Sequence, residues 1–178
     1  NLFDFILKNE NKKNTHFTPA SELKNLLKTV PFNEVKHLVP EDSWLYKECS
    51  KATENEMMVH FYEGDLEIDY IDLAQPLIEY ERRNEDYETY LREQTGMFLL
   101  ITGHLKANNL FSSNDDGAFG LVVLGDVEVQ NMVIGGSEIH ILQDLKVSDL
   151  LWGNYNHGSL YVACEIFARL ILMTEEYG

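Results

Sequence analysis

Three acidic residues, Asp126, Asp144 and Glu165, recur at the same position of a repeated sequence pattern and are the side chains best spaced for chemistry. Stacked repeats would bring them into one column with a spacing of about 4.8 Å. Paired carboxylates on such a scaffold can act as general acid and base, as in glycoside hydrolysis. The same column also forms where Asp simply suits a turn corner, and it can serve as an acidic strip that binds a partner. The turn interpretation is favoured, and partner binding ranks ahead of catalysis.

Other catalytic or metal-binding patterns are absent from the sequence. None of the six histidines stands at a metal-site spacing from another His, Cys or acid. A Gly-rich phosphate loop, Gly-x-Ser-x-Gly and His-Glu-x-x-His are also missing. Cys164 lies near His157 in the sequence, but we expect a structural thiol there rather than a nucleophile. The prediction is a protein that is not an enzyme and needs neither a metal nor another cofactor.

Two loops carry further candidates for partner binding. Residues 151–159 include Trp152 and Tyr155, and aromatic side chains are enriched at protein interfaces. The alternative for Trp152 is packing onto the edge of a repeat. Residues 111–120 hold a run of Ser, Asn, Asp and Gly, which is turn chemistry. The predicted partner-binding residues are Asp115, Asp116, Asp126, Asp144, Glu165, Trp152 and Tyr155.

These candidates are positioned by four imperfect copies of one unit in the C-terminal half. Each copy has apolar residues at its first, third, seventh, ninth and twelfth positions, which indicates strand, corner, strand. One such rung cannot bury its apolar face alone, whereas stacked rungs cover one another. The copies are LLITGHLKANNL (99–110), LVVLGDVEVQNM (121–132), IHILQDLKVSDL (139–150) and LYVACEIFARLI (160–171).

The corners of the first two copies carry Gly103 and Gly125, which we expect to bend the strand through a positive φ. A fifth, weaker copy spans residues 60–71 and shares the Gly-Asp-apolar core. The segment that follows it, residues 72–95, reads as helix or helix plus loop. The eighth positions of the stacked copies predict a Glu-Lys-Glu-Lys ladder that supports register and solubility.

The N-terminal segment has a helical pattern. Thr18 is predicted to cap a helix whose first residue is Pro19, Asn33 to cap a second, and residues 41–51 to form a third. We therefore predict an α+β protein: a short C-terminal β-solenoid of about four to five rungs with an N-terminal helical cap. Residues 1–95 are the cap with one outlying rung, residues 96–178 are the solenoid repeats, and together they form one compact unit.

The net charge of −16, from 30 acidic and 14 basic residues, bears on the partner. An acidic surface repels nucleic acid and anionic lipid and attracts a basic protein, although acidity also serves solubility alone. No apolar stretch is long enough to span a membrane, and no secretory leader pattern is seen. Two isolated cysteines do not form a disulfide framework, so we expect a cytoplasmic protein.

The runs LVVLGDV (121–127), GGSEI (135–139) and LWGNYNHG (151–158) resemble bacterial β-solenoid proteins of the polymer-forming or bactofilin-like kind. Similar proteins occur beside polymorphic toxins, where small acidic cytoplasmic proteins serve as immunity proteins. The resemblance covers residues 97–178. It implies a solenoid fold and either toxin binding or self-assembly, although the few rungs and the helical cap would hinder end-to-end growth.

Three hypotheses follow from the sequence. The first is an immunity protein that binds a basic toxin domain and neutralises it by occlusion, without nucleic acid or membrane as partner. The alternative is a bactofilin-like scaffold that self-assembles through its solenoid ends. The third is a carbohydrate-active solenoid that uses the column of carboxylates.

Overall fold

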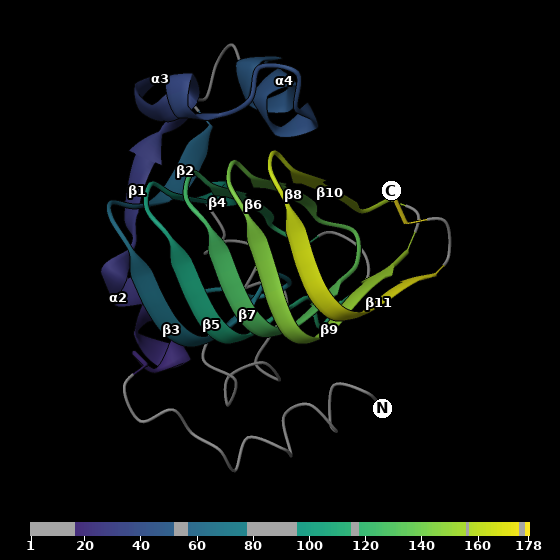
Figure 1. Ribbon diagram of the computed structural model, residues 1–178. Coiled ribbons are helices and arrows are strands. Elements are labelled where there is room, and N and C mark those ends of the chain that lie inside the picture. The colour runs from purple at the N-terminus through teal and green to yellow at the C-terminus, as the bar shows by residue number, and fades with distance from the viewer. Residues whose placement is uncertain (1–16, 52–56, 78–95, 115–117, 156, 175–176) are drawn as a thin grey trace.

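Two β-sheets, parallel except for the edge strand β1, face each other and wind into a solenoid (Figure 1). The computed structural model describes residues 17–51, 57–77, 96–114, 118–155, 157–174 and 177–178. One sheet, here called sheet B, has the order β1-β2-β4-β6-β8-β10, and the other, sheet A, has the order β11-β9-β7-β5-β3. The chain alternates between them because each strand pair is joined by a corner and each return loop leads one level further along the axis.

The solenoid strands are β2 (Met58–Tyr62), β3 (Leu66–Asp72), β4 (Gly96–Ile101), β5 (Leu105–Phe111), β6 (Gly120–Val123), β7 (Val127–Ile134), β8 (Glu138–Ile141), β9 (Leu145–Asn154), β10 (Ser159–Val162) and β11 (Ile166–Thr174). The ten strands stack as five strand pairs along the axis, from β2 and β3 to β10 and β11. The α+β fold with a short β-solenoid and a few short N-terminal helices is confirmed.

The core between the sheets is made of equivalent apolar residues stacked in register. Leu99, Leu121 and Ile139 lie in one column, and each is at most 1% exposed. In the first three copies the predicted inward residues are buried, with one exception. β9 holds an extra residue as a bulge, so Leu151 and not Leu150 stacks on Met132. The gapless alignment placed Leu150 wrongly because a bulge moves the following side chain by one position.

The weaker copy at residues 60–71 is a true rung. Its strands β2 and β3 pair in parallel with β4 and β5, and Leu66 lies beside Leu105 in the register. Most of the segment predicted as helix or loop after it, residues 78–95, lies outside the described residues. The rung therefore belongs to the solenoid although it is far from the other copies in sequence.

The N-terminal segment covers the first rung at both sheet edges. β1 (Lys28–Pro31) pairs antiparallel with β2, and Thr18 bridges Ile68 of β3. Between these contacts lie η1 (Ala20–Glu22) and α2 (Leu23–Leu26), and Leu23 is 2% exposed in the core. The predicted helix cap at Thr18 was wrong, because the Thr18 N–H and C=O bond to the backbone of β3 instead.

Two further helical segments cover the outer face of sheet B. They are α3 (Phe32–Val35), continued by η2 (Lys36–Leu38), and α4 (Trp44–Lys51). Asn33 does not cap this helix: Pro31 occupies the N-cap position, without a side-chain hydrogen bond. These helical segments and sheet B share a second hydrophobic cluster. In it, Phe32 and Leu45 pack against Phe98, Leu100 and Val122. Sheet B is therefore buried on both faces here, which explains the continuous apolar runs in β4 and β6.

The corner glycines serve close stacking and not a positive φ. Within the described residues, the positive-φ glycine is Gly64, in the outlying rung, and not Gly103 or Gly125. A Cβ on Gly125 would lie 2.7 Å from the Gly103 carbonyl oxygen and 2.9 Å from the His104 nitrogen. Because these neighbours are backbone atoms, they cannot move aside without shifting a whole rung.

We predict that Gly125→Ala lowers the free energy of unfolding by about 1–3 kcal/mol, because the added methyl group overpacks the corner. Gln143→Ala is the matched control at the same corner position of the third copy, where the side chain is exposed, and should change stability by less than about 0.5 kcal/mol. Urea unfolding followed by circular dichroism measures both. Equal stabilities of the two variants would contradict the close-stacking explanation.

Candidate functional site

The acidic column exists, and its side chains hold the corners of the solenoid together. Asp65 Oδ1 accepts the His104 N–H at 2.8 Å, and His104 Nδ1 accepts the Asp126 N–H at 2.9 Å. Asp126 Oδ1 accepts the Asp144 N–H at 3.1 Å, and Asp144 Oδ1 accepts the Glu165 N–H at 3.2 Å. We call these five residues the corner row. The side chains of the first four residues each accept a hydrogen bond from the backbone of the next rung, and Glu165 takes part through its N–H.

The corner row has a clear structural cause. A residue at a corner has left one strand and not yet entered the next, so its N–H has no partner in the sheet ladder. Asp and His carry an acceptor at the right reach, which is the local bonding that makes them turn residues. This supports the turn interpretation of the sequence. It leaves partner binding as a prediction, since one oxygen of Asp126 and one of Asp144 remain for other contacts.

The carboxylate oxygens of Asp126 and Asp144 that make no corner bond are accessible to solvent, and few basic side chains lie near them. The side chains of Asp126 and Asp144 are 39% and 31% exposed. Asp144 Oδ2 lies 4.0 Å from Lys146 Nζ, a weak pair at this exposure. Asp126 Oδ2 lies 3.4 Å from His104 Nδ1, but that nitrogen needs its lone pair for the 2.9 Å bond from the Asp126 N–H. The corner row therefore presents negative charge to the solvent, and the nearby basic side chain of Lys146 neutralises that charge only in part.

The loop candidates are distributed differently. Trp152 is half-buried at the end of β9, and its Nε1–H donates to Thr174 Oγ1 at 2.8 Å, so it packs on the edge of the last rung. Tyr155 follows with a φ of 94°, and its ring lies 5.0 Å from the His157 ring. Asp115 and Asp116 lie outside the described residues. Trp152 lies near the end of β9 and Tyr155 just after it, whereas the corner row lies at the other ends of the sheet A strands, so the predicted residues do not form one patch.

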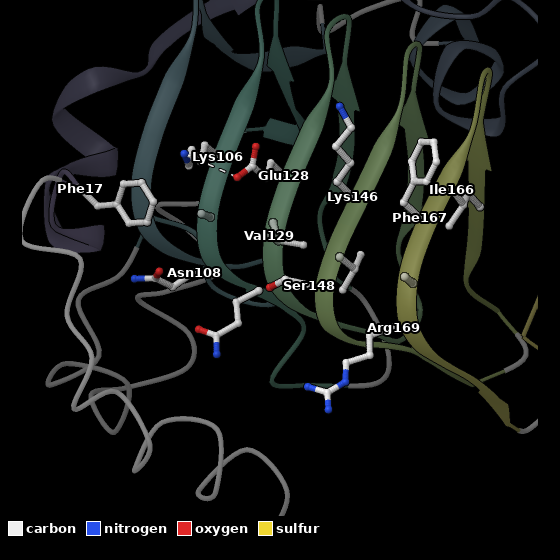
Figure 2. A pocket seen from close by; sticks show the side chains of 14 residues that line it. Phe17, Lys106, Asn108, Glu128, Val129, Lys146, Ser148, Ile166, Phe167 and Arg169 are labelled. Atoms are coloured by element: carbon white, nitrogen blue, oxygen red, sulfur yellow. Dashed lines mark ion pairs between the residues drawn. The ribbon is translucent and has the colours of Figure 1, made fainter.

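The outer face of sheet A carries rows of polar side chains over a shallow hollow (Figure 2). Glu67, Lys106, Glu128 and Lys146 lie side by side in the register, as the predicted ladder requires. Lys106 Nζ and Glu128 Oε1 are 3.5 Å apart, and Figure 2 marks this ion pair. The alternation of charges makes this row close to neutral locally.

A set of hydrogen bonds that the sequence did not predict connects α4 to the solenoid. The Glu138 carboxylate, 9% exposed, accepts the N–H groups of Trp44 at 3.0 Å and Leu45 at 2.8 Å. His140 Nε2 lies 3.1 Å from the same carboxylate, and the His140 ring stacks on Tyr161 at 4.7 Å. Glu138 therefore caps the start of α4 from a strand 94 residues away in sequence, which no local pattern predicts.

The charge of Glu138 is favoured by these hydrogen bonds. Burial alone would raise the pKa of its carboxyl, but the hydrogen bonds with His140 and the N–H groups of Trp44 and Leu45, together with the charge of His140, lower the pKa overall. A carboxyl whose pKa is lowered by folding stabilises the protein above its unfolded pKa and loses that contribution as the pH falls.

The last rung is left uncovered. Ile166 and Ile171 are 45% and 48% exposed, whereas Leu145 and Leu151, their neighbours in the register, are fully buried. Phe167, Leu170, Leu172 and Met173 are also 41–51% exposed. We call this surface the open end.

Part of the open end is covered by the last two residues. Gly178 accepts the Leu160 N–H at 3.0 Å, and Tyr177 packs against the core. The Tyr177 ring sits against Gly153 and Gly158, where a Cβ would collide with it. The β10 side of the open end is therefore partly occupied, whereas the large apolar side chains of β11 stay about half exposed.

Within the ranges that the structure describes, no three His, Cys, Asp or Glu side chains gather into a set able to hold a metal ion. None of the helices in that part of the chain has the length and apolar character that crossing a bilayer requires. Comparison with protein-family models, with curated proteins and with solved structures finds no match to this chain.

We predict that Asp126→Ala lowers the free energy of unfolding by about 1–2 kcal/mol, because the Asp144 N–H loses its acceptor. Asp126→Asn keeps a side-chain oxygen for that bond and should cost less than half as much. Urea unfolding of both variants tests this. If Asn and Ala destabilise equally, the corner bond is not what this side chain contributes.

We predict that Glu138→Gln lowers the stability at pH 7 by about 1–2 kcal/mol, because hydrogen bonds to a charged acceptor are stronger. The difference between wild type and variant should shrink as the pH falls from about 5 toward 3, since protonation removes the charge from the wild-type carboxyl. Thermal unfolding across this pH range measures the difference. A difference independent of pH would show that charge at Glu138 does not hold α4.

Proposed function

We propose that this chain is an immunity protein that binds a basic toxin domain in the cytoplasm and neutralises it by occlusion. The observation that carries the proposal is the corner row, in which the Asp126 and Asp144 carboxylates are fixed by hydrogen bonds from the backbone N–H groups of the next rung. Fixed carboxylates lose little conformational entropy when a partner binds. The regular spacing of the rungs lets several cations of one partner contact the row at once.

The overall charge supports the same proposal. A net charge of −16 favours encounter with a cationic protein and disfavours nucleic acid and anionic membranes. Asp126 and Asp144 keep one outward oxygen each after the corner bonds are made, so binding does not compete with folding. The resemblance of residues 97–178 to solenoids found beside polymorphic toxins points to a toxin as the basic partner.

A self-assembling scaffold is the second candidate function, and the open end favours it. A filament grows only if both ends of the solenoid can accept another copy. Here the first rung is covered by β1, α2 and Thr18, so the described part of the chain offers one end. This geometry supports a limited assembly and not an open-ended polymer.

We predict that the double variant Asp126→Asn, Asp144→Asn binds the basic partner at least about 10-fold more weakly than wild type, mainly through a slower association rate. The partner is first recovered with the tagged protein from its native cells and identified by mass. Binding is then measured by surface plasmon resonance at several salt concentrations. Asn keeps the corner bonds, so the loss would report charge and not folding.

The matched control is Glu67→Gln, Glu128→Gln, which removes the same charge from the outer face of sheet A. It should bind within about 2-fold of wild type, since rim charges far from the contact matter little. Equal binding by both double variants and by wild type would remove the corner row from the model. Recovery of no basic partner would reject the immunity proposal itself.

A further inference from the structure

The open end differs from every other level of the solenoid in what covers it. Each inward side chain of β9 is covered by the equivalent side chain of β11, as Leu145 is by Ile166 and Leu151 by Ile171. The side chains of β11 have the same apolar character, but among the described residues β11 is an edge strand of sheet A and no rung lies beyond it. The surface that would cover β11 is therefore one shaped like a rung of this same chain.

The size of the open end is large for a surface left in water. About half of each of six large side chains amounts to on the order of 500 Å² of apolar area per copy, near the upper limit for patches on monomers. Two such surfaces in contact would bury about 1,000 Å² before the backbone is counted, which reaches the threshold of a specific interface. A second copy of the chain is thus an adequate cover.

We propose that two copies of this chain pair through their open ends, with β11 (Ile166–Thr174) of one beside β11 of the other around a two-fold axis. The first rung of each copy is covered by its own N-terminal segment, so the open end of one copy meets the open end of the other. A two-fold axis makes the contact isologous and runs the two edge strands antiparallel.

The pairing uses β11 because the β10 edge is partly taken. Gly178 already accepts the Leu160 N–H, and Tyr177 packs beside it. Figure 2 shows Ile166 and Phe167 on the last strand, beyond the polar rows that β5, β7 and β9 carry. An exposed apolar edge strand of nine residues is the kind of element that pairs with another chain.

The affinity of this dimer should depend on salt concentration in the opposite direction from the affinity of a toxin complex. Two copies of net charge −16 repel each other, so salt screens the repulsion and strengthens an interface held by apolar contact. A complex with a basic partner weakens with salt for the same reason. The dimer and the proposed toxin binding therefore stand or fall separately.

The experiment is sedimentation velocity with light scattering on the full chain. We expect a species of twice the 20.6 kDa chain mass, whose dissociation constant falls at least about 3-fold between 50 and 500 mM NaCl. Leu170→Glu, Met173→Glu should leave only the single chain with an unchanged circular dichroism spectrum. The control Leu26→Glu places a charge on another exposed apolar residue, on α2, and should still form the dimer.

Cysteine cross-linking tests the geometry independently of these variants. Leu170 lies at the middle of β11, so Leu170→Cys in a Cys164→Ser background should form a disulfide between copies. Burial raises the pKa of Cys49 to about 11, so Cys49 stays unreactive. Exposed Cys164, at the corner before β11, lies far from its symmetry mate and should not cross-link in the wild-type chain.

Three results would overturn the proposal. The first is a single chain at every concentration up to about 100 µM, well above typical homodimer dissociation constants. The second is a dimer that survives both β11 charges. The third is a longer form of the polypeptide that stays single because residues after Gly178 cover β11.

Discussion

Vertical stacking of equivalent side chains is the interaction on which the rest of this structure depends. Leu121 is buried because Leu99 lies on one side of it and Ile139 on the other. Neither strand of a rung makes a core alone, so the stability of each level depends on its neighbours. The requirement for stacking also explains the close approach at Gly125 and the bulge in β9, which restores the column at Leu151 after one extra residue.

Stacking sets the role of the polar groups as well. At the corners, where the sheet ladder is interrupted, Asp126 and Asp144 replace it with side-chain bonds to the next rung. The geometry that satisfies the backbone thus also creates a straight row of outward oxygens. One carboxylate oxygen makes the corner hydrogen bond and the other does not, and for this reason amide and alanine substitutions test different contributions of the side chain.

The two ends of the solenoid meet the stacking requirement differently. At the first rung, Leu23 and β1 supply the cover that a preceding rung would otherwise give. α4 is fastened by Glu138, far away in sequence, so the helical part and the solenoid are joined by tertiary contacts. At the last rung, Ile166 and Ile171 have no such cover. The proposed pairing of two copies rests on this asymmetry.

The sequence by itself determined the rungs, because a period of apolar residues is a local property of the chain and burial follows from it. It located the corner row and the outlying rung at residues 60–71 for the same reason. Only the tertiary structure decided that Thr18 joins a sheet, that Leu151 replaces Leu150 in the core, and that Glu138 caps α4. These depend on residues brought together from distant parts of the chain, and no local periodicity encodes which surface ends up without a neighbour.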